Sequence, residues 1–559
     1  MLLFPSFIMA MFISMVLISP LIKFAPKIGL VDIPDARKVH KNVIPRVGGI
    51  AMVIAAIIPA FIWLPFNSRF LSFLVSVIII FTFGVWDDRS NLNYKIKFFG
   101  QIVATVIIVI IGDVQIRQLP FCGLEPVSEW ISVPLTIFVI LGITNAMNLV
   151  DGLDGLAGGT TLISFGAIGL LGYVTTIGEN IGTPYITLIA ISIMGSILGF
   201  LRFNTHPARI FMGDTGSQFL GFTIGSLAIM ITQQNDLPYN PGIPLILLCW
   251  PIFDTLMVMS IRIAQGKSPF VADKNHIHHR LLAIGLDHYE VVFVIYFVQA
   301  CLAVVAFCMR NFSDLHVMAT YIAINLCAVA FIFWADKNRG RFAICDEKTG
   351  LKRKSGKNRL GRYIQIAIKK GLPADVAFYV SLLSFPAAYL FAIIIIRDGL
   401  EKDIAVQIGL VSAVVAVIML LTGYICRKEP IKLPERIGAY LIAALIVYTI
   451  NELPEQYKGI APVINIFFVV LAITVVIGFR FSRDYRFKIT TLDFLVIFSV
   501  IMLNITPIIP AKHSLFGLHL VLFFYALEYL ISSINKHTNI YRISSVTMLA
   551  LFSLRCFYM

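Results

Sequence analysis

The sequence predicts an all-α polytopic integral membrane protein with about 18 transmembrane helices, and three observations support this fold class. Hydrophobic residues make up 58% of the 559 residues and charged residues only 14%, whereas a soluble domain carries roughly 25% charged residues. Apolar runs close to the length of about 20 residues that crosses a bilayer as a helix recur along the whole chain. Lys and Arg gather in alternate loops between these runs.

The apolar runs fall into two groups on either side of a basic segment. Residues 336–373 carry twelve Lys and Arg, which breaks the series of runs and predicts a cytoplasmic linker. We therefore expect an 11-helix domain over residues 1–335, this linker, and a seven-span domain of unknown function over residues 374–559. The runs of the first domain are 3–22, 48–65, 70–86, 96–112, 131–147, 160–177, 184–201, 216–233, 243–263, 291–309 and 317–335. The later runs lie near 375–396, 405–425, 437–451, 461–479, 491–509, 516–534 and 543–557.

The loops of the first domain carry very different numbers of cations on their two sides. One alternate set of loops holds thirteen Lys and Arg and the other set only three. Cytoplasmic loops carry the excess of Lys and Arg, so the first set is predicted to face the cytoplasm. The first cation, Lys23, follows the first apolar run, which is opposite to the polarity of a signal peptide. This run is expected to be a retained span with the N-terminus outside.

Five polar clusters interrupt the first domain on its predicted cytoplasmic side. Adjacent Asp87 and Asp88 repel each other unless a cation lies between them, and Asp151 and Asp154 share a helix face at a spacing of three. Several carboxylates without a close Cys/His set favour Mg²⁺, with Mn²⁺ as an alternative. Zinc is the rival interpretation for the last cluster, which contains three histidines. The clusters are residues 32–49, 87–89, 148–155, 204–216 and 273–280.

The combination of acidic, basic and glycine-rich loops suits phosphoryl transfer. That reaction needs a metal to neutralise developing charge, cations on the transferring group and strict positioning. The chain has no Walker A sequence, which argues against a P-loop ATPase or an ABC transporter. Its basic residues lie in short loops between spans, so nucleic-acid binding is not expected.

At the five clusters the sequence resembles the polyprenyl-phosphate N-acetylhexosamine-1-phosphate transferases. The resemblance covers about residues 1–335. The motif sequences are more similar to those of the N-acetylglucosamine-1-phosphate branch than to those of the peptidoglycan branch. The matching motifs are D-x-P-x-x-R-K-x-H from Asp32, P-R-x-G-G from Pro45, D-D-R from Asp87, N-L-V-D-G-L-D-G-L-A-G-G from Asn148, H-P-A-R-I-F-M-G-D-T-G-S from His206, P-I-F-D-T from Pro251 and D-K-N-H-I-H-H-R-L-L from Asp273.

The resemblance implies a role for each matching polar residue. Asp214 is similar to the Mg²⁺ ligand of the family, and Phe211 would stack on uracil. Catalytic roles are implied for Asp87, Asp88, Asp151, Asp154, His276, His278 and His279. Substrate-binding roles are implied for Lys41, Asn148, Asn204, Arg209 and Phe211.

The implied reaction is transfer of a sugar-1-phosphate from a UDP-sugar to undecaprenyl or another polyprenyl phosphate, with release of UMP. UDP-GlcNAc is the default donor, and the lipid product would initiate a cell-envelope polysaccharide. The family implies a bacterial plasma (inner) membrane protein with a cytoplasmic active site. The expected partners are the two substrates and membrane lipids, with a homodimer as an alternative to a monomer.

Two other interpretations of the chain stay open at the level of sequence. One is a transporter or flippase of lipid-linked sugars, which would keep ionisable residues at the bilayer midplane; Asp254 is the main such residue in the first domain. The other is an inactive lipid-binding scaffold. The chain also departs from the D-D-x-x-D pattern of many family members, because Asn91 takes the place of the third acid.

Overall fold

The computed structural model describes residues 3–32, 43–122, 126–179, 185–233, 239–268, 275–337, 461–481 and 518–527, with single residues elsewhere between 413 and 551. The chain divides into two compact units. The first comprises Met1–Arg353 with Thr490–Leu495, and the second comprises Lys354–Ile489 with Val496–Met559. The linker predicted over 336–373 lies almost wholly outside the described residues and stays a prediction.

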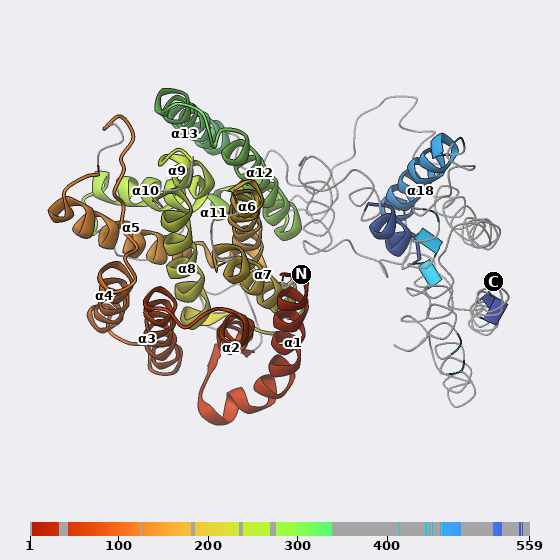
Figure 1. The fold of residues 1–559 in the computed structure, drawn as a ribbon, viewed down its shortest axis with the longest axis horizontal. Coiled ribbons are helices and arrows are strands. Elements are labelled where there is room, and N and C mark those ends of the chain that lie inside the picture. Colours follow the sequence, from red (N-terminus) through yellow and green to blue (C-terminus); the bar gives the residue numbers. More distant parts are fainter. Residues whose placement is uncertain are drawn as a thin grey trace, which may run out of the picture. The chain divides into compact units, whose positions relative to one another are not determined.

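The first unit is a bundle of helices with one short β-hairpin (Figure 1). Its helices are α1 (Leu3–Ile28), α2 (Gly48–Trp63), α3 (Ser68–Ser90), α4 (Tyr94–Ile110), α5 (Glu129–Val150), α6 (Leu156–Glu179), α7 (Tyr185–Asn204), α8 (Gly213–Gln233), α9 (Ile243–Leu247), α10 (Cys249–Ala264), α11 (Ile277–Ile284), α12 (His288–Cys308) and α13 (Asp314–Lys337). Its strands are β1 (Val31–Asp32) and β2 (Ile44–Pro45).

The helices explain the apolar runs, and they confirm a mostly helical membrane protein. Among the described residues, seven helices are long and apolar enough to cross a membrane. The number rises to eight if α1, which bends by 48° next to Pro20, is one broken span. Helices α2 and α4 are 16 and 17 residues long, near the lower limit for a span. The predicted totals of eleven and eighteen spans are not confirmed.

The ninth predicted run, 243–263, is not one helix, and that expectation was wrong. The chain breaks at Leu248 into α9 and α10. Pro251 has no N–H to donate to the carbonyl of Leu247 four residues earlier, so a continuous helix would leave that carbonyl unpaired. The buried amide of Gln299 on α12 donates to the Leu247 oxygen instead, at 2.9 Å. A side chain of the neighbouring helix α12 thus satisfies the carbonyl that the break leaves free.

In the second unit, the described residues include α18 (Ala461–Phe481), which coincides with the run predicted at 461–479. A shorter apolar helix over Leu518–Leu527 falls within the run predicted at 516–534. The other five predicted runs of this half lie mostly outside the described residues. The seven-span count therefore stays a prediction.

Helix α8 forms the core of the first unit, and α13 lies at its edge (Figure 1). Every residue from Thr215 to Thr232 is buried. Helices α2, α3 and α5 pack on α8, and glycines bring two of them very close at the end where α8 begins. A Cβ at Gly49 would lie 2.3 Å from the Gly216 nitrogen, and one at Gly84 would lie 2.6 Å from the Thr215 Cα.

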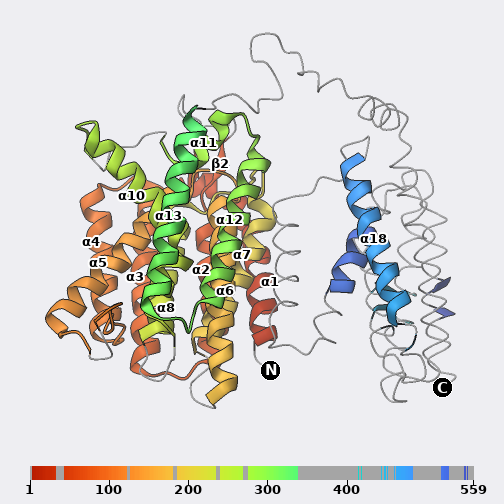
Figure 2. The ribbon, with the colours of Figure 1, turned by 90° about the horizontal axis from the view of Figure 1, so that it is seen from above.

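The β-hairpin joins the beginning of the chain to the segment before α8. Val31 and Asp32 pair antiparallel with Pro45 and Ile44. Backbone hydrogen bonds then run from Phe211 N to Pro45 O at 2.8 Å and from Gly48 N to Phe211 O at 3.0 Å. Figure 2 shows β2 and α11 at the same end of the first unit, opposite the N-terminus. Most polar residues of the motifs lie at this end.

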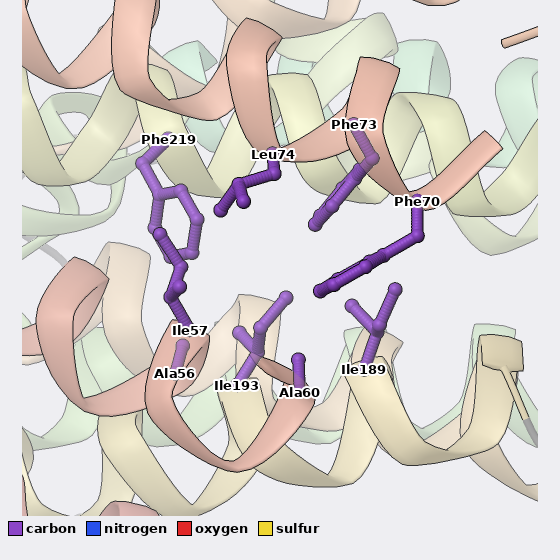
Figure 3. Close-up of a pocket in the computed structure, with 9 residues that line it drawn as sticks. All are labelled: Ala56, Ile57, Ala60, Phe70, Phe73, Leu74, Ile189, Ile193 and Phe219. Carbon is purple, nitrogen blue, oxygen red and sulfur yellow. The ribbon is translucent and has the colours of Figure 1, made fainter. Parts of the chain in front are cut away.

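An apolar crevice separates α2 from α3 near the other end of these helices. Figure 3 shows its side chains pointing toward one another, with only hydrocarbon and aromatic groups around the space. Phe70 is 17 residues before Asp87 on α3, which corresponds to about 25 Å along the helix. The crevice therefore takes no part in polar chemistry. Its lining residues are Ala56, Ile57, Ala60, Phe70, Phe73, Leu74, Ile189, Ile193 and Phe219.

The close approach of α2 and α8 predicts a selective effect of added side-chain volume. Gly49→Ala should destabilise the folded protein by about 1–3 kcal/mol, because the neighbours of the new methyl group are backbone atoms that cannot rotate away. Gly142→Ala on α5 is the control, since nothing lies within 4 Å of a Cβ there. Thermal unfolding in detergent should show a lower midpoint for the first variant alone, and equal midpoints would contradict the packing.

Candidate active site

The carboxylate of Asp88 joins the end of α3 to the beginning of α8. It accepts hydrogen bonds from Asp214 N at 2.7 Å, Thr215 N at 3.0 Å and Thr215 Oγ1 at 2.6 Å. These N–H groups belong to the first turn of α8, where a helix has no internal acceptors for them and where negative charge is favoured. Gly213 has φ +69°, and a Cβ there would lie 2.4 Å from the Asp88 carboxylate. A glycine is thus required at this position.

Lys97 forms ion pairs with both Asp87 and Asp214. Its Nζ lies 3.0 Å from Asp87 Oδ2 and 2.9 Å from Asp214 Oδ1. Asp87 Oδ1 accepts from Leu92 N at 2.8 Å, whereas its buried Oδ2 has no partner in hydrogen-bond geometry among the described residues. The contact of Lys97 with this oxygen is therefore a charge contact at short range. It leaves Oδ2 able to accept a proton or a hydrogen bond.

The end of helix α5 places Asn148 and Asp151 beside the same acids. The Asn148 amide donates to Asp214 Oδ1 and to Ser217 Oγ, the latter at 2.7 Å. Asp151 follows the last residue of α5. Desolvation by the surrounding protein, followed by repulsion from Asp214 and Asp88, raises the pKa of Asp151 to about 7, although its side chain still reaches solvent. We call Asp87, Asp88, Asp151, Asp214 and Lys97 the acid centre.

The donor set of the acid centre fits a hard divalent cation. The carboxylates of Asp87 and Asp214 share the lysine ammonium, which offsets the repulsion between them, and Asp88 binds the backbone of Asp214. All available donors are oxygens, which suits Mg²⁺ or Mn²⁺ and does not suit a thiolate- or imidazole-binding metal. Asp214 and Asp87 are the two acids that share the ammonium. They are therefore the residues that could hold such an ion.

Asp154 lies in a second group of contacts and ties several segments together. Its Oδ2 lies 2.6 Å from His206 Nδ1 and accepts from Ala208 N at 3.1 Å. Its backbone oxygen lies 3.1 Å from His288 Nε2, and the His206 and His288 rings stack at 4.1 Å. Nearby, the Asn204 amide accepts from Gly155 N and donates to Ile210 O. Asp154 and Asn204 thus hold the loop between α7 and α8 in place.

The three histidines at 276, 278 and 279 do not lie together as ligands of a transition metal. Among the described residues, Asp154, His206 and His288 form the one group of three or more His, Cys, Asp or Glu side chains whose ligand atoms all lie within 4.8 Å of one another. Within this part of the chain, neither the three histidines nor the acid centre forms such a group. The zinc interpretation of the three histidines therefore finds no support. The ligand atoms of Asp154 and His206 already form a mutual hydrogen bond, so this second group is stable without a metal.

The histidine motif packs against the loop that follows α5. A Cβ at Gly152 would lie 2.5 Å from His278 Nε2, so the absence of a side chain there admits the imidazole. Burial, followed by repulsion from His279, lowers the pKa of His278 to about 3, and the ring is neutral at physiological pH. His278 Nε2 is buried without a hydrogen-bond partner among the described residues.

The structure brings some of the predicted residues together and leaves others apart. Lys41 lies outside the described residues, Arg209 is exposed and Phe211 is partly buried. Lys97 was not predicted as a site residue, although its position ten residues after Asp87 on the next helix was a usable signal. The partners of Asp154 and of the histidine motif were also missed, because nothing local in the sequence pairs them. These missed partners are His206, His288 and Asp254.

Comparison with known proteins identifies similar sequences over the first half of the chain. The family model described as glycosyl transferase family 4 matches residues 70–232. A probable undecaprenyl-phosphate N-acetylglucosaminyl 1-phosphate transferase of Bacillus subtilis is 37% identical over 304 residues, which cover 54% of this chain and 83% of that protein. An undecaprenyl-phosphate alpha-N-acetylglucosaminyl 1-phosphate transferase of Yersinia pestis is 32% identical, over 51% of this chain and 78% of its own. A decaprenyl-phosphate N-acetylglucosaminephosphotransferase of Mycobacterium tuberculosis is 33% identical, over 50% and 75%.

The raised pKa of Asp151 predicts a pH-dependent stability difference. Because the folded-state pKa of about 7 exceeds the ordinary value of 3.8, the folded protein binds this proton more tightly than the unfolded chain. The stabilisation is complete below about pH 4 and is lost as the pH rises to 7. The melting temperature of the wild type should therefore fall relative to that of Asp151→Asn between pH 5 and pH 7.5. A difference that does not change with pH would contradict this assignment.

Proposed function

Because the chain belongs to glycosyl transferase family 4, the family of polyprenyl-phosphate sugar-1-phosphate transferases, we propose that it transfers a sugar-1-phosphate from a UDP-sugar to undecaprenyl or another polyprenyl phosphate. An oxygen of the lipid phosphate attacks the β-phosphorus of the donor. The bond from that phosphorus to the bridging oxygen breaks, and UMP leaves with the electron pair. The names of the relatives favour UDP-GlcNAc as donor.

The observation that carries this proposal is the contact of Lys97 with two acids at the end of the helix bundle. An ammonium 3.0 Å from Asp87 and 2.9 Å from Asp214 gives one short-range cation beside two anionic groups. Phosphoryl transfer depends mainly on positioning and on neutralising charge at the transferring group. The ammonium of Lys97 would also be able to neutralise charge on a bound diphosphate, and Asp87 and Asp214 would be the residues to hold a divalent cation there.

The two adjacent acids of α3 have different surroundings, and these support different roles. Asp88 accepts three hydrogen bonds from the beginning of α8, so it holds Asp214 in position. Among the described residues, Asp87 accepts one backbone hydrogen bond, from Leu92 N to Oδ1, and its Oδ2 contacts the Lys97 ammonium, at 3.0 Å, so it is the better candidate to take a proton from the acceptor phosphate. This contact requires a heavy-atom distance of about 2.6–3.2 Å in the bound state.

A Mg²⁺ ion held by Asp214, with Asp87 beside it, is part of the proposal. When bound, it would neutralise charge on the diphosphate and polarise the attacked phosphorus. Asn148 supports this role, since its amide donates to Asp214 Oδ1 and Ser217 Oγ and so fixes the rotamer of the carboxylate. Mn²⁺ has the same preference for oxygen and is the alternative ion.

The remaining predicted residues would bind the nucleotide and the diphosphate. Phe211 is partly buried and joins α2 through its backbone, so its ring has a fixed support for stacking on uracil. Arg209, which is exposed, would meet a phosphate, and Lys41, outside the described residues, stays a predicted phosphate contact. The excess of cations in alternate loops of the first domain supports a cytoplasmic active site in the bacterial inner membrane, where UDP-sugars are made.

The proposed reaction predicts a metal-dependent release of UMP. Purified full-length protein, given polyprenyl phosphate, Mg²⁺ and a panel of UDP-sugars, should release UMP and form a lipid diphospho-sugar, with UDP-GlcNAc the fastest donor. Excess EDTA should stop turnover, and added Mg²⁺ should restore it. Release of UDP would mean that a glycosidic bond had been broken, and full turnover in EDTA would exclude the metal.

The acid centre predicts different consequences for three substitutions of Asp by Asn. Asp214→Asn should abolish turnover, and Asp87→Asn should lower kcat by at least about 100-fold, both with little change in melting temperature. Asp88→Asn should lower the melting temperature as well, because the amide cannot accept all three hydrogen bonds. Asp113→Asn, an exposed acid that pairs with Arg117, is the control for activity. Unchanged turnover in Asp214→Asn would remove this residue from the site.

A further inference from the structure

Asp254 is a buried acid of the helix bundle. It lies on α10 as the one charged residue from Cys249 to Ser260, and it is only 2% exposed. Burying an ionised carboxylate is strongly unfavourable unless it is paired and hydrogen-bonded. A carboxylate in such a place therefore has either a function in transport or a specific partner.

Its partners belong to the histidine motif. Asp254 Oδ2 lies 2.8 Å from His276 Nδ1, and Oδ1 accepts from Ile277 N at 2.8 Å. Ile277 is the first residue of α11, and the residue before it, His276, makes no side-chain cap of its own. The carboxylate of Asp254 thus caps the N-terminus of α11 by accepting from Ile277 N. It also holds the ring of His276, which lies 22 residues after Asp254 in the sequence.

This pairing fixes which nitrogen of His276 carries the proton. An ionised carboxylate can only accept hydrogen bonds, so the proton between the two groups lies on Nδ1. Nε2 is then the nitrogen that can meet a ligand, and carboxylate partners of this kind fix both tautomer and ring orientation. The opposite tautomer would place a lone pair against the buried carboxylate.

A short series of contacts leads from this pair to the acid centre. The rings of His276 and His278 are nearly parallel, at 12° and 5.6 Å between centroids. His278 packs on Gly152, which follows Asp151, and the charge of Asp151 interacts with those of Asp214 and Asp88. These contacts place the histidine motif beside the loop that carries Asp151 of the acid centre.

We propose that Asp254 is a positioning residue for the transfer reaction: it holds His276 with the proton on Nδ1 and presents Nε2 to the phosphate groups of the substrates. The inference rests on the proposed function. It also assigns to the site the acid that, from sequence alone, would most favour transport. Asp254 acts through His276 and does not itself touch the substrate.

The tautomer can be measured without any turnover. In protein labelled with ¹⁵N-histidine, the His276 signals are identified by their loss in His276→Gln. The wild type should show a protonated Nδ1, and Asp254→Asn should move the proton to Nε2, because the amide nitrogen can donate to Nδ1. An unchanged tautomer in Asp254→Asn would overturn the inference. This measurement stands even if the proposed reaction is wrong, which the UMP assay decides separately.

A double-mutant cycle tests the effect on the reaction. Asp254→Asn and His276→Gln should each lower kcat by roughly 10- to 100-fold, the range for residues that orient a functional imidazole. The double variant should lose no more than the single variants, since both remove one unit. Donor affinity and melting temperature should stay within about twofold and a few degrees of the wild type. Additive losses, or a lower melting temperature with normal kcat, would show a purely structural role.

Thr255→Val is the matched control. Thr255 is the next residue on the same helix, and its hydroxyl is buried without a hydrogen-bond partner among the described residues. Its removal should leave kcat unchanged. If Asp254→Asn does not yield a monodisperse protein, Asp254→Glu replaces it in the cycle. The longer side chain of Glu would displace the imidazole of His276. The inference therefore requires Asp254→Glu to lower kcat in the wild type but not in the His276→Gln background. An equal fall in kcat in both backgrounds would overturn it.

Discussion

The hydrogen bonds between Asp88 and the first turn of α8 are the interaction on which the candidate site depends. Inside a membrane protein the first N–H groups of a helix have little access to water, and here a carboxylate from another helix satisfies two of them. The same carboxylate fixes the direction in which α8 begins. Asp214 is therefore held beside Asp87 and Lys97, and the remaining acids are arranged around a backbone that cannot move independently.

Most of the fold could be predicted because the membrane imposes one length and one composition on each span. The runs of the first half coincide with helices, but the break at Leu248 could not be found from hydropathy, since its two parts are equally apolar. Pro251 gave a signal, yet whether a proline kinks or ends a helix depends on what satisfies the freed carbonyl. In this protein that group is Gln299, which lies on a helix far along the chain.

The site was predictable where a motif carries its own chemistry, and it was not predictable where two distant residues complete each other. Adjacent Asp87 and Asp88 indicated a charged centre at once. Their unequal surroundings, one saturated with hydrogen bonds and one not, follow only from the position of α8. Asp254 is a second example, because its partner is also distant in the sequence. From sequence alone it resembled an intramembrane acid of a transporter, whereas its contact with His276 explains why a carboxylate is buried there.

The packing of α2 and α3 on α8 has a mechanical consequence. Where Gly49 and Gly84 meet α8, backbone touches backbone, and such contacts cannot be relieved by changing a rotamer. Toward the other end of α2 and α3, Ala60 and Phe70 border an apolar crevice, where the contacts include side chains that can change rotamer. We expect α2 and α3 to be rigid where they meet the beginning of α8, near the acid centre, and more easily displaced at their other ends. Changes in bilayer thickness or lateral pressure would then be absorbed far from the phosphates, and the distances between the catalytic groups would stay constant while the membrane around them deforms.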